Sequence, residues 1–430
     1  MFLVAFILIA AIVYYFFINR ILGLPPGPPP LPLIGNMLSF RWELDDVLLS
    51  WKARYGRIFT VWLPLPMVVI GDHKVLQEHV VKNGNNFIDR KNPEQLLDLW
   101  FGGLYGLAFQ DNSMVKEQRK FALKTFHEIG FNSASVEDTV HNYAVEVANR
   151  WKRSGGEAVD ITVNIEKAVG NVIWNLTFGI DLDFDNELLP KYRQIQRDFI
   201  LLMAGPLMMF IELFPFLRKF DFLFGHHIKQ LKDLFDENNQ IVDDAIKITE
   251  SNFCADSHPR SYVEAFIREM KKIKEAGKPM GNFHYQQMLA SAVNLWGAGF
   301  ETTVGILRLC IIELINHPDA QRKVQEEIDS VIGERTSQDT EIEGMIIKTT
   351  DCCSLLLENA GHPIASGTTI LPQFSMVHFD PNEFERPYHF CPERHIDDQG
   401  QFIKVPSTVE FSYGFTRALT DFNVRIQPRN

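Results

Sequence analysis

The chain has 430 residues, of which 46% are hydrophobic and 22% are charged. These proportions are typical of a folded globular protein and exclude a disordered or repeat-rich one. Acidic residues number 54 against 42 Lys and Arg, and because the resulting net charge of -12 opposes contact with polyanions, we exclude nucleic acid as a partner.

An uncharged apolar stretch runs from Phe2 to Ile18. It is just long enough to cross a bilayer, and it lacks the basic start and the small-residue cleavage site of a signal peptide. We therefore predict a membrane anchor over residues 1–22. Arg20 follows the stretch, and the positive-inside rule then places the rest of the chain in the cytoplasm. The alternative, a helix buried in the core, would be unusual at the end of a chain.

The segment after the anchor, residues 23–36, contains the run LPPGPPPLPLIGN. Its prolines fix the backbone in an extended form, so we predict a semi-rigid hinge between the membrane and the main domain, residues 37–430. Such a run could also bind an SH3 or WW domain. Its place between an apolar anchor and a globular sequence favours the hinge.

Most of the main domain has helical spacing. Between Trp51 and Gly71, β-branched and aromatic residues form two short runs, which predicts a small sheet. From about residue 73 to 333, apolar residues recur at helical intervals between Gly, Pro and Asp breaks. A further extended piece is predicted from Gly367 to Val377. The fold class is therefore mainly α with a smaller β region.

The longest helical pattern begins near Phe283 and is stopped by Pro318. It is apolar on nearly every face, which would also fit a membrane span. Charged residues such as Glu301 and Arg308 interrupt it, however, and each would be costly in hydrocarbon. We therefore predict the central buried helix of a large domain.

Within this helix, the run AGFETT starts at Ala298 and carries candidate chemistry. Ala298 and Gly299 leave room for a flat ligand against the backbone. The hydroxyl of Thr302 can bond the Ala298 carbonyl and widen the helix locally. Glu301 offers a proton, and an acid beside an alcohol would suit proton delivery to a bound oxygen species. The residues alone leave open an ordinary helical threonine and a solvated or paired glutamate.

The chain resembles microsomal cytochrome P450 monooxygenases, especially those of family 2, across almost its whole length. The resemblance rests on the anchor, the hinge, YGRIF, KEQRKFAL, AGFETT, HFDPNEF and FCPERH. It implies one mainly helical P450 domain that encloses haem between the long helix and a cysteine-bearing loop. It also implies a protein of the endoplasmic reticulum membrane, with its catalytic domain facing the cytoplasm, that oxidises small lipophilic molecules with O2. Electrons would come from NADPH-cytochrome P450 reductase, with cytochrome b5 as a second candidate partner.

The resemblance also assigns roles to residues. Glu301 and Thr302 match the acid and the alcohol of the family's oxygen-activation site. Arg119, in a helix predicted from Met114 to Phe126, matches the arginine that binds a haem propionate, a role that suits a guanidinium. Val115 replaces the tryptophan that the family usually has four residues earlier. Three lysines of this helix share one face: Lys116, Lys120 and Lys124. In the family such a face docks the reductase. An ordinary solvated helix explains the pattern equally well.

The haem-ligand loop departs from the family pattern Phe-x-x-Gly-x-Arg-x-Cys-x-Gly. It begins correctly with Phe411 and Gly414, which the resemblance assigns to haem binding. Thr416 then holds the arginine position and Ala418 the cysteine position, and the helix that should follow is missing. The cysteine thiolate is the axial ligand of P450 iron, so this loop supplies no metal ligand and haem binding is expected to suffer.

A second family element, the helix with a Glu-x-x-Arg ion pair, is missing between Glu334 and Gly367. Glu383 and Arg386 have the right spacing but fall in a predicted turn. The five cysteines are irregularly spaced, which favours a reducing compartment over a disulfide framework or a zinc site. None of them, Cys391 included, is expected to replace the lost ligand. The fold is thus predicted to be an internally truncated P450 fold, and two hypotheses stay open: a haem monooxygenase, or a catalytically inactive P450-like membrane protein.

Overall fold

The computed structural model describes two compact parts of the chain, which we treat separately as unit 1 and unit 2. Unit 1 comprises Met1–Ile88 with Met345–Arg417, and unit 2 comprises Asp89–Gly344 with Ala418–Asn430. Within these spans, the described residues are 6–7, 9–10, 12, 14, 23–31, 34–39, 44–63, 65–87, 94–108, 112–129, 134–154, 158–203, 207–208, 211, 214–255, 257–331, 369–373, 375–396, 403 and 423–425.

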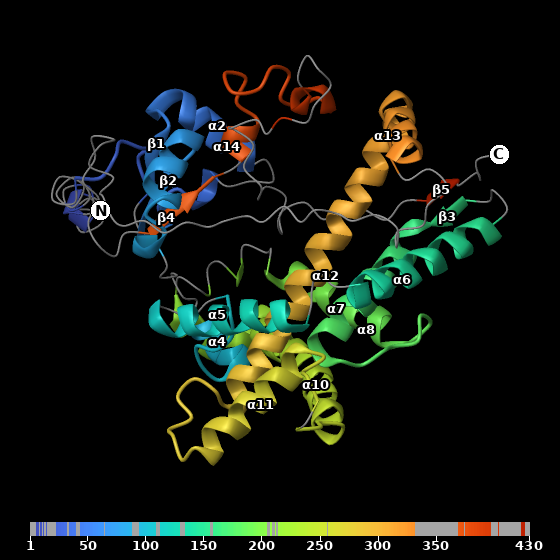
Figure 1. Ribbon diagram of the computed structural model, residues 1–430. Coiled ribbons are helices and arrows are strands. Elements are labelled where there is room, and N and C mark those ends of the chain that lie inside the picture. The colour runs from blue at the N-terminus through green and yellow to red at the C-terminus, as the bar shows by residue number, and fades with distance from the viewer. Residues whose placement is uncertain are drawn as a thin grey trace. The chain divides into compact units, whose positions relative to one another are not determined.

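Unit 1 contains the predicted small sheet (Figure 1). Strands β1 (Ile58–Leu63) and β2 (Leu65–Ile70) form an antiparallel pair, and β4 (Thr369–Pro372) lies parallel to β2 in the order β1-β2-β4. The two short strands predicted between residues 51 and 71 are therefore confirmed, although residues 51–55 belong to helix α2 (Leu44–Tyr55). The β segment predicted over 367–377 is too long, because the described strand ends at Pro372 and Ser375 begins a short helix, α14 (Ser375–His378).

Helix α2 (Leu44–Tyr55) connects the sheet to the segment after β4. Lys52 of α2 donates from Nζ to Oδ2 of Asp380 at 2.5 Å and to the carbonyl of Met376 at 2.7 Å. Burial raises the pKa of Asp380, but the hydrogen bonds from Lys52 and Asn382 and the charge of Lys52 together outweigh burial and leave that pKa below its usual value. The remaining short elements of unit 1 are η1 (Met37–Ser39), α3 (His73–Val75), η2 (Leu76–Val81), η3 (Gly84–Phe87) and η7 (Pro392–His395).

Unit 2 is almost wholly helical, as predicted. Its small sheet pairs β3 (Ala158–Asp160) with β5 (Asn423–Arg425) in antiparallel fashion. Its helices are α4 (Glu94–Phe101), α5 (Asn112–Ile129), α6 (Ala134–Arg153), α7 (Ile161–Phe178), α8 (Leu188–Met203), η4 (Pro215–Phe224), α10 (His227–Ser251), α11 (Tyr262–Glu275), α12 (Tyr285–Asn316) and α13 (Pro318–Val331).

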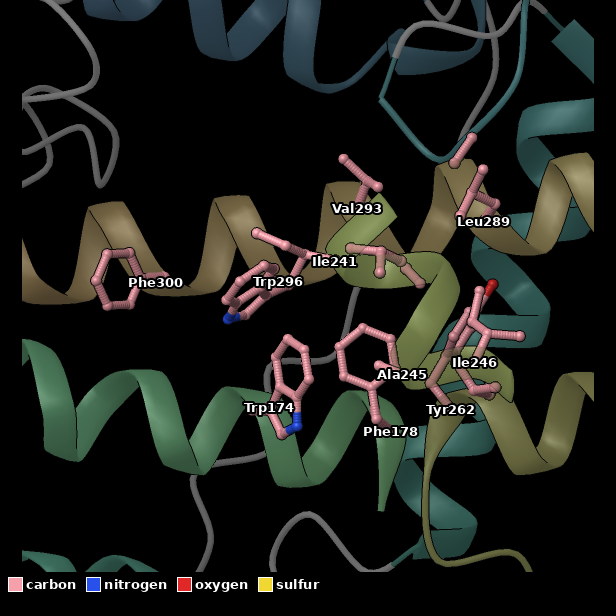
Figure 2. Close-up of a cluster of buried hydrophobic side chains, with 14 of the residues drawn as sticks. Trp174, Phe178, Ile241, Ala245, Ile246, Tyr262, Leu289, Val293, Trp296 and Phe300 are labelled. Carbon is pink, nitrogen blue, oxygen red and sulfur yellow. The ribbon is translucent and has the colours of Figure 1, made fainter. Parts of the chain in front are cut away.

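Helix α12 is the long helix predicted from the sequence. The side chain of His284 caps it by accepting from the Gln287 backbone N–H, and it ends two residues before Pro318. Helix α7 packs along it, and Figure 2 shows the aromatic contact between them. Trp296 of α12 is fully buried and meets Trp174 of α7 edge to face, with ring centroids 4.7 Å apart. These rings fix how α12 lies on α7, and so they position the residues that α12 carries.

No helix among the described residues, α12 included, combines the length and the apolar character that a bilayer crossing requires. The anchor predicted over residues 1–22 lies largely outside the described residues, and those described there do not support it.

Candidate functional site

An apolar cavity lies in unit 2 between α5, α7 and α12. It encloses about 440 Å³. Thr177 and Asn294 are its polar members, and the full lining is Leu107, Ala108, Phe126, Ile173, Leu176, Thr177, Asn294, Leu295, Ala298 and Gly299. The structure thus places Ala298 and Gly299, the residues predicted to leave room for a flat ligand, on the wall of a cavity.

One wall of the cavity is a loop held by two polar side chains of α12. Asn294 accepts through Oδ1 from the backbone N–H of Leu107 at 2.8 Å and of Ala108 at 3.2 Å. Gln287 accepts from the Gly106 N–H at 3.1 Å and donates to the Gly106 carbonyl at 3.0 Å. A Cβ at Gly106 would lie 2.3 Å from the Asn294 Oδ1, so only glycine fits there.

Sequence reasoning did not assign a role to this pair of side chains. The spacing of the two residues could have indicated that role, because residues seven positions apart share one face of a helix. Two amides on the same face of an otherwise apolar helix indicate that a backbone loop is bound there.

Arg119, predicted to bind a haem propionate, lies behind this loop. Its Nε donates to the Leu107 carbonyl at 3.0 Å. Val115, at the position of the family's tryptophan, is fully buried. Arg119 is therefore linked to the cavity wall by its hydrogen bond to Leu107. Val115 packs in the core, and its side chain has no hydrogen-bond donor for a propionate.

The AGFETT segment keeps the predicted hydrogen bond but not the predicted widening. Thr302 donates from Oγ1 to the Ala298 carbonyl at 2.7 Å. Helix α12 nevertheless remains α-helical throughout, so the locally widened turn is wrong. The prediction that the segment is buried is also wrong at Ala298, Thr302 and Thr303, which are exposed. The helical period accounts for Ala298 and Thr302, because Trp296 and Phe300 occupy the core-facing side and leave these two residues on another.

Glu301 lies away from the cavity, among charged groups of α8 and α12. Burial raises its pKa, and the charges of Arg193 and Arg308 oppose that rise without cancelling it. Arg193 itself forms an ion pair with Glu166, with Nε and Oε1 3.2 Å apart. Glu301 therefore retains its proton to a higher pH than a solvated glutamate, as an acid would. The structure places neither Glu301 nor Thr302 among the residues that line the cavity.

The comparison with protein families decides the identity of this scaffold. The cytochrome P450 family model matches residues 25–347, about three-quarters of the chain. The chain belongs to the cytochrome P450 family. Members of this family bind haem and act as monooxygenases, and the resemblance to family 2 is confirmed.

Curated relatives of this P450 chain come from several animals. It is 27% identical to a probable cytochrome P450, CYP36A1, of Caenorhabditis elegans, over 99% of the chain and 90% of that protein. It is 27% identical to cytochrome P450 2G1 of Rattus norvegicus and 29% identical to cytochrome P450 2A5 of Mus musculus, in each case over 91% of the chain and 82% of the relative. The family match ends before Phe411, Gly414 and Ala418, which lie outside the described residues.

The lining of the P450 cavity suits the porphyrin ring of haem but supplies no ligand for its iron. Its apolar walls suit the porphyrin, and Arg119 beside the loop suits a propionate. The iron needs an axial ligand, and none of the ten lining residues carries a thiolate or an imidazole. The described free cysteines, Cys254, Cys310 and Cys391, do not line the cavity, and no metal-binding cluster occurs among the described residues. We therefore derive no chemical step at a haem iron for this chain.

Proposed function

We propose that this scaffold is built for haem-dependent oxidation of small lipophilic molecules of the fatty acid, steroid or xenobiotic type, with O2. The observation that carries the proposal is the cavity of about 440 Å³ beside Ala298 and Gly299. Its volume lies in the range of small-molecule sites, and its nearly apolar lining suits the porphyrin ring, with a propionate at Arg119 outside that lining. A lipophilic substrate would pack beside the ring, because its apolar surface then leaves water.

Two groups of residues would serve this function. Arg119, Ala298 and Gly299 would hold the porphyrin, with Phe411 and Gly414 of the ligand loop completing its surroundings. Glu301 and Thr302 would act as the acid and the alcohol, a proposal that the raised pKa of Glu301 supports. Because neither lines the cavity of the described residues, their roles require that bound haem lies along the exposed face of α12 that includes Thr302.

The proposed setting is the cytoplasmic side of the endoplasmic reticulum membrane. Residues 1–22 would form the anchor, 23–36 the hinge and 37–430 the P450 domain. NADPH-cytochrome P450 reductase would supply electrons, with cytochrome b5 as a second donor. An exposed basic face on α5 supports an acidic protein partner: Lys116, Lys120 and Lys124.

A second function, that of a catalytically inactive P450-like membrane protein, is favoured by two observations on the sequence. Ala418 stands where the family has its thiolate, and an alanine cannot bind iron. The bracing Glu-x-x-Arg helix is also missing from the sequence between Glu334 and Gly367. For the chain as written, we propose that the scaffold remains but oxygen activation is lost.

The test restores first the cysteine alone and then all the missing parts together. Three proteins would be expressed in membranes with the reductase: the chain itself, Ala418→Cys, and a chain carrying both the ligand loop with its helix and the Glu-x-x-Arg helix of a family 2 relative. Product formation from a fatty acid, a steroid and an alkoxycoumarin would be measured. We expect product only from the fully restored chain. Oxygenated product from the unaltered chain would refute the proposed loss, and inactivity of a folded, haem-loaded restored chain would refute the proposed monooxygenase scaffold.

A further inference from the structure

A second pocket opens in unit 2 between α5, α11 and the segment that precedes α11. It encloses about 530 Å³ and shares no residue with the apolar cavity. Its lining combines aromatic rings with charged side chains: Phe121, Lys124, Thr125, Glu128, His258, Pro259, Ala265, Arg268, Glu269, Lys272 and Phe283. This pairing of an apolar surface with charges distinguishes it from the first cavity and indicates a different class of ligand.

The apolar part of the pocket belongs to an aromatic cluster. Phe121 meets Phe283 edge to face with ring centroids 5.2 Å apart, and both rings contact the fully buried Phe266 at 5.5 and 5.2 Å. Three rings that hold one another in place give a fixed apolar surface. A flat or aliphatic group can pack on it without rearranging the protein.

The charged part of the pocket has a positive surplus. Lys124 pairs with Glu128 at 3.4 Å, and Lys272 pairs with Glu269 at 3.6 Å. Arg268 is the third cation, and no described carboxylate lies within ion-pair distance of it.

The guanidinium of Arg268 binds backbone carbonyls of the segment before α11. It donates from Nη1 to Ala255 at 2.8 Å and from Nη2 to Cys254 at 3.3 Å, and also to Ser257. These carbonyls orient the guanidinium but do not neutralise its charge. A cation held in place beside an apolar surface is a recognition element for an anion.

We propose that this pocket binds a small organic monoanion, a carboxylate attached to an apolar ring or chain. The apolar group lies on Phe121 and Phe283, and the carboxylate faces Arg268 and Lys272. A dianion or an inorganic anion is disfavoured because Glu128 and Glu269 line the same pocket. The site shares no residue with the proposed haem site, and only Lys124 with the proposed reductase face, so carboxylate binding can be tested separately from haem binding and oxidation.

The test uses the full-length chain in detergent and three probes of one shape: 4-phenylbutyrate, the uncharged 4-phenylbutanamide and the cationic 4-phenylbutylamine. Binding would be measured by isothermal titration calorimetry at low ionic strength. We expect the carboxylate to bind about tenfold more tightly than the amide, with the amine weakest, and added salt to reduce the difference because the charges are partly exposed. Equal binding of carboxylate and amide, or no binding of the carboxylate, would overturn the proposal.

Two matched variants locate the site. Lys272→Gln removes a pocket charge and is expected to weaken 4-phenylbutyrate about threefold, since partly exposed ion pairs contribute modestly. Lys274→Gln removes the same charge from the same helix outside the pocket lining, and it should leave affinity unchanged. Arg268→Gln is a poorer choice because it also releases the segment before α11. Equal weakening by both lysine variants, with unchanged melting temperatures, would show a general charge effect and refute the site.

Discussion

Blocking part of the apolar cavity should weaken porphyrin binding without unfolding the protein. Ala298 lines the cavity, yet its side chain is exposed, so the substitution Ala298→Phe can place a phenyl ring there without disturbing the buried face of α12. Covering roughly 80 Å² of apolar wall removes about 2 kcal/mol of binding free energy at about 25 cal/mol per Å². That corresponds to a loss of affinity of about thirtyfold. The cost to the helix is small, roughly 0.5 kcal/mol for Phe in place of Ala.

Iron-free protoporphyrin IX is the suitable probe, because its binding does not depend on an axial ligand. Fluorescence anisotropy would give its affinity, and thermal unfolding would report the fold. Thr303→Phe is the matched control, since Thr303 is exposed on the same helix and does not line the cavity. We expect the control to bind porphyrin as the unaltered chain does. Unchanged binding by Ala298→Phe would refute the assignment of this cavity to the cofactor.

Three further predictions concern stability and location. Trp296→Ala empties a fully buried site and should lower the free energy of unfolding in urea by about 4 kcal/mol. Burial raises the pKa of Glu301 above its usual 4.5, so the folded state holds this proton more tightly than the unfolded state does. The free energy of unfolding should therefore fall as pH rises from 4.5 through the raised pKa. Melting temperatures across this range should fall less for Glu301→Gln. Deleting residues 2–22 should move the protein from the membrane pellet to the soluble fraction or into aggregates, whereas carbonate-resistant membrane binding of the deletion variant would indicate another insertion site.

The spacing of apolar residues, together with the residues that cap or terminate helices, was enough to predict the framework of the fold. The long helix was placed within two residues at each end, because Pro318 stops it and the polar His284 caps its start. The paired strands around residue 64 followed from β-branched and aromatic residues. In both cases the determinants are local, so the sequence expresses them directly.

The site could be predicted only in part, because its geometry depends on contacts between distant segments. The hydrogen bond from Thr302 to Ala298 spans four residues and was predictable. The support of the loop at Gly106 by Asn294 joins positions far apart in sequence, and periodicity does not encode such a pair. Likewise, Glu301 lies near Arg193 because α8 packs against the bundle, and no local pattern indicates that contact.

The most direct test of the account is the absorption spectrum of the reduced, carbon-monoxide-bound protein purified from membranes. With Ala418 at the thiolate position, we expect any bound haem to lack the red-shifted Soret band of thiolate coordination, and the fully restored chain to show that band. A red-shifted band from the unaltered chain would prove that another cysteine, Cys391 being the first candidate, binds the iron, and it would contradict the loss of oxygen activation proposed for this P450.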